Sequence, residues 1–538
     1  MEWTARTGPK VRDKSYWEDW CHRHLNYKSG TDLEAYIKYE SETSLIPYIS
    51  KRPFRRLIMH GATENNRNYQ SEMNIINRGL PPKNYDLWTC ARAGYFASDG
   101  DMVVGRDLYN LIEIHNNVEY IEIDKYEFYY IIEALADWID GDEPDNPVDD
   151  IIAFINDYPD VVISIYASGY QELALVLYFV KICKLEYVNV ESNSLKISEL
   201  NDKSILYGEI SDLLDIQSPT QFNNKEDVEN HLYKEKLISP LIKMYGPKLL
   251  NIMKGTPGCT IKYSTNLEQH IYLLKHYFVD LYKMYDICAK PTRSSDGERI
   301  LFHIDPRDNH QLDRTIEHIH KFKEDYIFEP FIYFKKYNNE EIIPSCHIIN
   351  GYAVNKYCTN QIIGKGGSWK GNDLITKNDV KPMNISVLFQ TMIEYISEIA
   401  RESRRQNMGL SMAGIDCFEG TIPSEDEIIN TILWRGPQDP NIRFTGAIYL
   451  YKALDKARNQ LNINELNIST RVFIPKYNFK KTYVLVEQFN NEHFSLETKT
   501  VCGLIIACKD SWGMIYATGT NIYRSTATAD ELLDFLQK

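Results

Sequence analysis

The chain has 538 residues, and its 43% hydrophobic and 25% charged residues are ordinary for a globular protein of roughly three domains. Its formal net charge is -15 and it has no long run of lysine or arginine, so we do not expect nucleic acid as a partner. No apolar run approaches the roughly 20 residues that a membrane-spanning helix needs, so we expect no membrane partner either.

The ten cysteines indicate a reducing compartment, because they are scattered and form no Cys-x-x-Cys pair of the kind that binds zinc or cycles between thiol and disulfide. No secretory signal opens the sequence, so we expect a cytoplasmic protein. The 13 histidines lack metal-ligand spacing. We interpret those near strands, such as His60, His303 and His347, as solvated or hydrogen-bonded within the protein.

In the N-terminal third, residues 57–62 form an apolar run ending in a small loop, as a buried strand does. Residues 86–91 and 118–123 are two more candidate strands, and residues 125–139 have the spacing of an amphipathic helix.

Residues 161–190 are the clearest unit of this part. A β-branched run is followed by a turn, an apolar helical segment (172–183) and a second strand (185–190). This βαβ order favours a parallel sheet with helices on its faces. The loop at 167–169 lies where such sheets bind ligands, but without a full Gly-x-Gly-x-x-Gly pattern a dinucleotide is not expected.

From residue 286 onward, strands and tight loops dominate. We expect a hairpin from 286–291 and 299–304, strands at 325–335 and 342–354, a glycine-rich turn or mobile loop at 364–372, and an amphipathic helix at 385–401. Residues 414–418 and 428–434 are a candidate antiparallel pair, and the chain closes with short strands and a helix at 528–536.

Lys290 ends a predicted strand just before a loop of small residues. A lysine at this place can reach bound phosphates, and Ser294, Ser295 and Gly297 allow backbone N–H groups to approach them closely. The alternative is a surface hairpin with an exposed lysine.

Glu329 and Phe331 lie in the apolar segment 327–332. Such a segment can offer backbone groups to an adenine edge and apolar walls to its ring, although Pro330 supplies no N–H donor. An edge strand with one exposed glutamate explains the fragment equally well.

Asp439, Asn441 and Arg443 alternate along the chain, so in an extended segment they share one face. A carboxylate and an amide oxygen can hold Mg²⁺, and a guanidinium can hold a phosphate or an acyl phosphate. Asp416, in the apolar strand before them, can complete the metal site. The alternative is a polar turn in which residues 439–441 merely reverse the chain.

Taken in order, these motifs resemble the ATP-grasp ligases over residues 203–447. Residues 200–203 and 214–219 look like the opening of that fold, and residues 289–297, 328–332, 414–418 and 439–447 are similar to its phosphate lysine and loop, nucleotide hinge and two magnesium strands. Residues 359–364 and 369–372 further resemble the branch in which a pre-ATP-grasp domain precedes the ligase.

The resemblance implies an α/β and α+β multidomain fold with a Rossmann-like N-terminal domain. The expected division is 1–195 (pre-ATP-grasp domain), 196–335 (nucleotide-clasping lobe), 336–455 (lobe with the metal site) and 456–538 (small C-terminal α+β extension). It implies ATP and Mg²⁺ as cofactors, with Asp416, Asp439 and Asn441 as metal ligands. Lys290, Ser294, Ser295, Gly297, Glu329 and Phe331 would bind the nucleotide, and Arg443 and Lys290 would act in catalysis.

The implied reaction is phosphorylation of a carboxylate by ATP followed by attack of an amine, with small-molecule, amino-acid or peptide substrates. The family usually has Glu where this chain has Asp439, so a nucleotide-binding protein without catalysis stays an alternative. A second phosphate lysine is expected before Lys290, at Lys254 or Lys262. The sequence leaves open whether the chain forms a homodimer.

Overall fold

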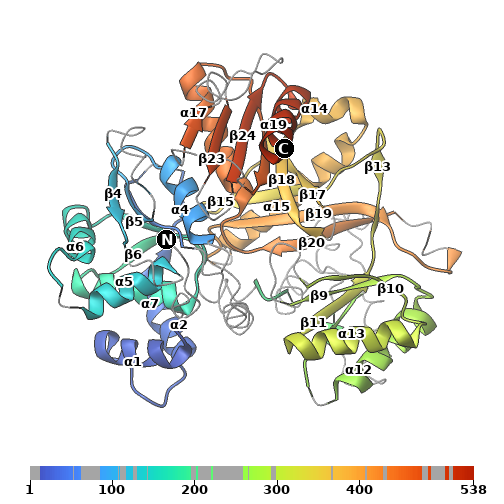
Figure 1. Ribbon diagram of the computed structural model, residues 1–538, viewed down its shortest axis with the longest axis horizontal. Helices are drawn as coiled ribbons and strands as arrows, with labels where there is room; N and C mark the ends of the chain where they lie inside the picture. Colours follow the sequence, from blue (N-terminus) through green and yellow to red (C-terminus); the bar gives the residue numbers. More distant parts are fainter. Residues whose placement is uncertain are drawn as a thin grey trace.

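The computed structural model describes most of the chain as three β-sheets with covering helices (Figure 1). The described residues are 12–51, 54–61, 85–106, 108, 117–124, 130–141, 143–194, 201–203, 220–221, 258–264, 266–292, 299–364, 367–405, 409–427, 430, 433–474, 483–485, 503–507 and 513–538.

The first sheet has six strands in the order β1-β6-β5-β2-β3-β4, and every pair of neighbours is parallel. Its strands are β1 (Leu45–Pro47), β2 (Arg56–Met59), β3 (Met102–Gly105), β4 (Glu119–Glu122), β5 (Val162–Ile165) and β6 (Val188–Glu191). Its helices are α1 (Lys14–Leu25), α2 (Leu33–Ser44), α4 (Tyr85–Tyr95), α5 (Ile131–Asp140), α6 (Pro147–Asp157) and α7 (Tyr170–Ile182). The predicted βαβ unit is therefore confirmed as β5-α7-β6.

The prediction of a strand at 86–91 is wrong, because these residues lie in α4. Buried positions continue from residue 89 through residue 97, which is longer than a typical strand. The short run at 86–91 has no clear alternation of apolar and polar residues, so its period cannot separate a buried strand from a buried helix.

The second sheet is small and has the order β10-β9-β11-β8-β7. Its strands are β7 (Thr220–Gln221), β8 (Cys259–Ile261), β9 (Ile287–Pro291), β10 (Leu301–Ile304) and β11 (Tyr326–Pro330), and α12 (Leu267–Leu274), the π-helix η3 (Lys275–Leu281) and α13 (Asn309–Phe322) accompany them. The predicted hairpin is confirmed as the antiparallel pair β9–β10. In Figure 1 this sheet, in green, lies apart from the blue N-terminal sheet.

The third sheet is large, mostly antiparallel and runs to the end of the chain. Its strands are β12 (Tyr333–Phe334), β15 (Pro344–Ile349), β16 (Tyr352–Ala353), β17 (Tyr357–Ile363), β18 (Trp369–Thr376), β19 (Ala413–Thr421), β20 (Trp434–Asn441), β21 (Asn467–Phe473), β22 (Tyr483–Leu485), β23 (Gly503–Ala507) and β24 (Gly513–Gly519). β13 (Lys336–Tyr337) and β14 (Glu340–Glu341) form a separate hairpin. Since β18 pairs with β21, strands after residue 456 continue the same sheet, and the domain division stays a prediction.

Helices cover this sheet on both sides. They are α14 (Lys377–Val380), the 3-10 helix η5 (Lys381–Met383), α15 (Ser386–Arg405), α17 (Gly446–Leu461) and α19 (Ile522–Gln537). The predicted amphipathic helix is confirmed as α15, which packs on Cys346, Ile348 and other residues of the strands beneath it. Residues 369–372, expected in a loop, belong to β18, and the preceding strand β17 ends at Ile363.

The strand β20 corrects the predicted partner of β19 and decides between the two alternatives for residues 439–441. The antiparallel partner of β19 begins at Trp434, where the predicted strand at 428–434 ends, and residues 439–441 are strand rather than turn. Pro437 and Pro440 concealed this strand, because proline cannot donate to a ladder. Within the described residues β20 pairs only with β19, and an edge strand tolerates proline.

The N-terminal sheet shares one hydrophobic core with α17 and the C-terminal strands, including Ile163, Phe444 and Ile448. No helix in the described part of the chain is long and apolar enough to cross a membrane.

Asn193, which follows β6, links this sheet to the residues just before β19 and just after β20. Its amide nitrogen donates to the carbonyls of Met412 (2.7 Å) and Ile442 (2.9 Å), and its oxygen accepts from the N–H groups of Ser411 (2.8 Å) and Met412 (2.9 Å). The side chain is buried, so all four of its bonds lie away from water.

We expect Asn193→Ala to lower the free energy of unfolding by at least about 2 kcal/mol, because it leaves several buried backbone groups without partners. Urea unfolding followed by circular dichroism measures the change. The exposed Asn266, whose side chain makes no cap hydrogen bond, gives a matched control, and Asn266→Ala should shift stability by less than about 0.5 kcal/mol. Equal effects of the two substitutions would contradict this.

Candidate active site

The pairing of β19 with β20 places Asp416 directly opposite Asp439, and Gly414 directly opposite Asn441. Directly opposed residues in an antiparallel pair project from the same face of a sheet. The two carboxylates and the amide predicted as metal ligands are therefore brought together on one face.

Asp416 is buried, with 7% of its surface exposed. Ser345 Oγ donates to its Oδ1 (2.5 Å) and Gln361 Nε2 donates to its Oδ2 (2.7 Å). Burial, and secondly the negative charge of Asp439, raise the pKa of Asp416 to about 7 despite these two donors. Burial therefore makes this carboxyl harder to ionise than an exposed one.

Asp439 is partly exposed, but its Oδ1 atom is buried and has no hydrogen-bond partner among the described residues. The ammonium of Lys203 lies 3.3 Å from that oxygen and forms an ion pair with it, although the two groups do not have the geometry of a hydrogen bond. An unsatisfied carboxylate oxygen beside a second carboxylate suits a hard divalent cation, so this donor set fits Mg²⁺.

Lys290 approaches the same strand from the small sheet. Its side chain is buried, forms an ion pair with Glu329 Oε1 (2.5 Å), and donates from Nζ to the carbonyl of Gln438 (3.1 Å). Lys290 is therefore not an exposed hairpin lysine, and Glu329 is not an exposed edge residue. The neighbouring Ser294, Ser295 and Gly297 lie outside the described residues.

Lys203 is a candidate site residue that the sequence did not indicate. It is buried, and its N–H donates to the carbonyl of Thr292 (2.8 Å), just after β9. Of the two lysines proposed instead, Lys254 lies outside the described residues and Lys262 is exposed. The signal was the fragment 201–203, which marked the start of the resemblance without suggesting a role for its lysine.

Phe331 lies where the chain passes from the small sheet to the large one, between β11 and β12. Its ring is half-buried and packs against His303, with ring centroids 4.2 Å apart, and against Tyr333. Its N–H already donates to the carbonyl of Asp286 (3.1 Å), so this group is occupied by the protein itself.

Arg443 lies two residues beyond the strand, and its buried guanidinium faces the N-terminal sheet. It donates to the hydroxyl of Tyr166 (3.3 Å), the carbonyl of Phe444 (2.9 Å) and Oδ1 of Asn441 (3.2 Å). Tyr166 follows β5, so the carboxyl edge of the parallel sheet meets the site at this arginine.

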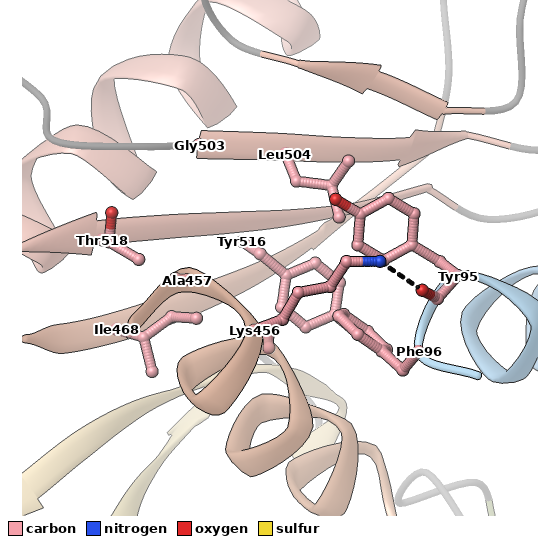
Figure 2. A pocket seen from close by; sticks show the side chains of 10 residues that line it. Tyr95, Phe96, Lys456, Ala457, Ile468, Gly503, Leu504, Tyr516 and Thr518 are labelled. Carbon is pink, nitrogen blue, oxygen red and sulfur yellow. Dashed lines mark hydrogen bonds between the residues drawn. The ribbon is translucent and has the colours of Figure 1, made fainter. Parts of the chain in front are cut away.

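A separate pocket, open to solvent, lies between α4, α17 and the C-terminal strands (Figure 2). Tyr95, Phe96, Leu504 and Tyr516 are among its lining residues, and Lys456 Nζ donates to the carbonyl of Tyr95 (2.9 Å). Burial lowers the pKa of Lys456 to about 8. None of the site residues predicted from sequence lines this pocket.

The raised pKa of Asp416 predicts a pH-dependent stability. When a carboxyl has a higher pKa in the folded state than in the unfolded state, the folded protein loses stability as the pH rises from the ordinary carboxyl pKa near 4 towards 7. In EDTA, the melting temperature of Asp416→Asn relative to that of the unmodified protein should therefore become more favourable between pH 5 and pH 8.5. A difference that stays constant with pH would show that Asp416 titrates normally.

No family model matches the sequence, and no curated protein matches it. Among solved structures, similar chains are the N5-carboxyaminoimidazole synthase of Aspergillus clavatus in complex with ADP (11% identity, 90% of this chain and 99% of that chain, TM-score 0.42) and the Campylobacter jejuni biotin carboxylase (10%, 84% and 89%, 0.42). The biotin carboxylase domain of the Hydrogenobacter thermophilus 2-oxoglutarate carboxylase is another (12%, 85% and 88%, 0.40). These similarities are remote, so the function is argued from the site itself.

Proposed function

We propose that the protein is an ATP-grasp ligase that activates a carboxylate as an acyl phosphate and joins it to an amine. The observation that supports this most directly is the meeting of four groups at β20. Asp416 and Asp439 oppose each other there, and the buried ammonium groups of Lys203 and Lys290 contact Asp439 and its neighbour Gln438.

In this proposal Lys203 and Lys290 bind the phosphates of ATP. Both ammonium groups are already desolvated and held by carboxylates, Asp439 and Glu329 respectively. Phosphate oxygens would take over part of this pairing, and in a buried site each such contact is stronger than in water.

Asp416, Asp439 and Asn441 would hold Mg²⁺ through carboxylate and amide oxygens, with phosphate oxygens of the substrate as further ligands. When bound, the ion neutralises charge on the phosphates during transfer. Without it, protonation of Asp416, the ammonium of Lys203 and the donors Ser345 and Gln361 relieve the repulsion between the two carboxylates.

Phe331 and the segment around it would receive the nucleotide base, since an apolar ring and a sheet-to-sheet crossing suit a planar heterocycle. Because the N–H of Phe331 is occupied, a backbone donor for the base has to come from a neighbouring residue such as Ile332.

The proposed chemistry balances in two steps. A carboxylate oxygen of the acid attacks the γ-phosphorus and ADP leaves. The amine nitrogen then attacks the acyl carbon, phosphate leaves, and one proton is released. Arg443, three residues beyond Pro440, would hold the carboxylate or the acyl phosphate through a guanidinium that is already positioned by Tyr166 and Asn441.

We expect Asp416→Asn to lower the rate of substrate-dependent ADP release at least about 100-fold, because it removes a charged metal ligand. A coupled assay with small carboxylic acids and amines as candidate substrates measures this. The exposed Asp280 supplies the control, and Asp280→Asn should retain full activity. An unimpaired Asp416→Asn protein would overturn the metal assignment. Binding of Mg-ATP by calorimetry without turnover on any pair would favour a nucleotide-binding protein without catalysis.

Lys203→Ala should weaken ATP binding by at least about tenfold, because it removes a buried cation from the phosphate site. Isothermal calorimetry with Mg-ATP measures the dissociation constant. The exposed Lys262 is the matched control, and Lys262→Ala should bind ATP as the unmodified chain does. The reverse ranking would return the role of second phosphate lysine to Lys262.

A further inference from the structure

A row of polar side chains continues beyond Asp416 on the same face of the large sheet. Ser345 lies opposite Asp416, and His347, two residues further along β15, lies opposite Gly414. Side chains alternate along a strand, so His347 projects from the face that carries the proposed metal ligands. The proposed chemistry gives His347 no role.

The ring of His347 is 1% exposed and is oriented by a chain of hydrogen bonds. Trp369 Nε1 donates to Oδ1 of Asn372 (2.8 Å), Asn372 Nδ2 donates to Thr359 Oγ1 (3.2 Å), and Thr359 Oγ1 lies 3.1 Å from His347 Nε2. Because the Thr359 hydroxyl accepts from Asn372, its own proton is free to point at Nε2. The proton of the neutral ring is then on Nδ1.

That Nδ1 atom is buried and has no hydrogen-bond partner within the described part of the chain. A Cβ atom placed on Gly414 would lie 3.2 Å from it and 2.8 Å from the methyl group of Thr445. Nδ1 and the Thr445 side chain therefore converge on the same side of Gly414. Burial lowers the pKa of His347 to about 3, so the ring is a neutral donor.

Thr445 is the N-cap residue of α17, which is 16 residues long. Its side chain caps no N–H group, and its buried Oγ1 also lacks a partner among the described residues. The N–H groups of a first helical turn have no acceptor within the helix and attract negative charge. Trp369 forms a wall here, since a Cβ on Gly446 would lie 2.5 Å from its indole.

We propose that His347, Thr445 and the N-terminus of α17 bind the carboxylate of the amine substrate, so that the acceptor is an amino acid. This rests on the proposed ligase function. The carboxylate to be phosphorylated has to lie near Lys203, Lys290 and the metal ligands. The new subsite lies beside Gly414, two residues along β19 from Asp416, and offers neutral donors, which suit a carboxylate that does not react.

Two substitutions of one residue test the role of Nδ1. His347→Gln keeps a nitrogen near the Nε2 position and removes the donor at Nδ1, whereas His347→Asn keeps an amide donor near Nδ1. With a pool of the common amino acids as acceptors, we expect His347→Gln to raise KM for the active amino acid at least about tenfold, with KM for ATP within about twofold. His347→Asn should recover most of this loss. The matched pool of amino-acid amides should be inactive with the unmodified protein.

An unchanged acceptor KM in His347→Gln, or equal use of the amides, would overturn the subsite. A direct probe separates it from the ligase proposal. In protein labelled with ¹⁵N-histidine, the amino-acid pool should shift the ring signal of His347, and Thr445→Val should abolish that shift. A shift without any ADP release would support the subsite and count against the ligase, whereas ADP release without a shift would do the opposite.

Discussion

The register of β19 against β20 is the constraint on which the rest of the site depends. It holds the carboxylates of Asp416 and Asp439 on one face, in a buried place where two negative charges repel. A one-residue slip would send Asp439 and Asn441 to the opposite face and leave no site. The protein meets the repulsion with Ser345 and Gln361 as donors and with a lysine brought from a distant segment.

Three sheets contribute to this one place. The small sheet supplies Lys290 and Glu329, the large sheet supplies the carboxylates, and the parallel sheet supplies Tyr166 as a support for Arg443. Buried ion pairs such as Lys290–Glu329 contribute little to folding, because removing two charges from water costs about as much as their attraction returns. In the proposed ligase, this pair would instead keep the ammonium of Lys290 in place for the phosphates of ATP.

Patterns with a clear period were predictable from the sequence. The βαβ unit, the β9–β10 hairpin and α15 are where the patterns put them, and the alternation of Asp439 and Asn441 gave their common face. Arg443 lies beyond the end of β20, where its guanidinium faces the N-terminal sheet. The roles of these residues stay predictions. Short runs without a clear period and strands that contain proline led to wrong predictions, as at α4 and β20. Lys203 was missed because its partners Thr292 and Asp439 lie far away in the chain, which no local pattern reports. The interpretation of His347 as hydrogen-bonded within the protein is confirmed.

Because of Asn193, the two flanks of the candidate site are attached to β19 and β20 in different ways. The four hydrogen bonds of its side chain link the parallel sheet to residues just before β19 and just after β20. The small sheet instead shares a hydrophobic core with Phe418 in the second half of β19 and with Ile422 just after it. It approaches the carboxylates through long side chains such as that of Lys290. In the proposed ligase, a nucleotide would therefore enter as the small sheet changes its angle to β19 and β20, with residues 330–333 as the hinge.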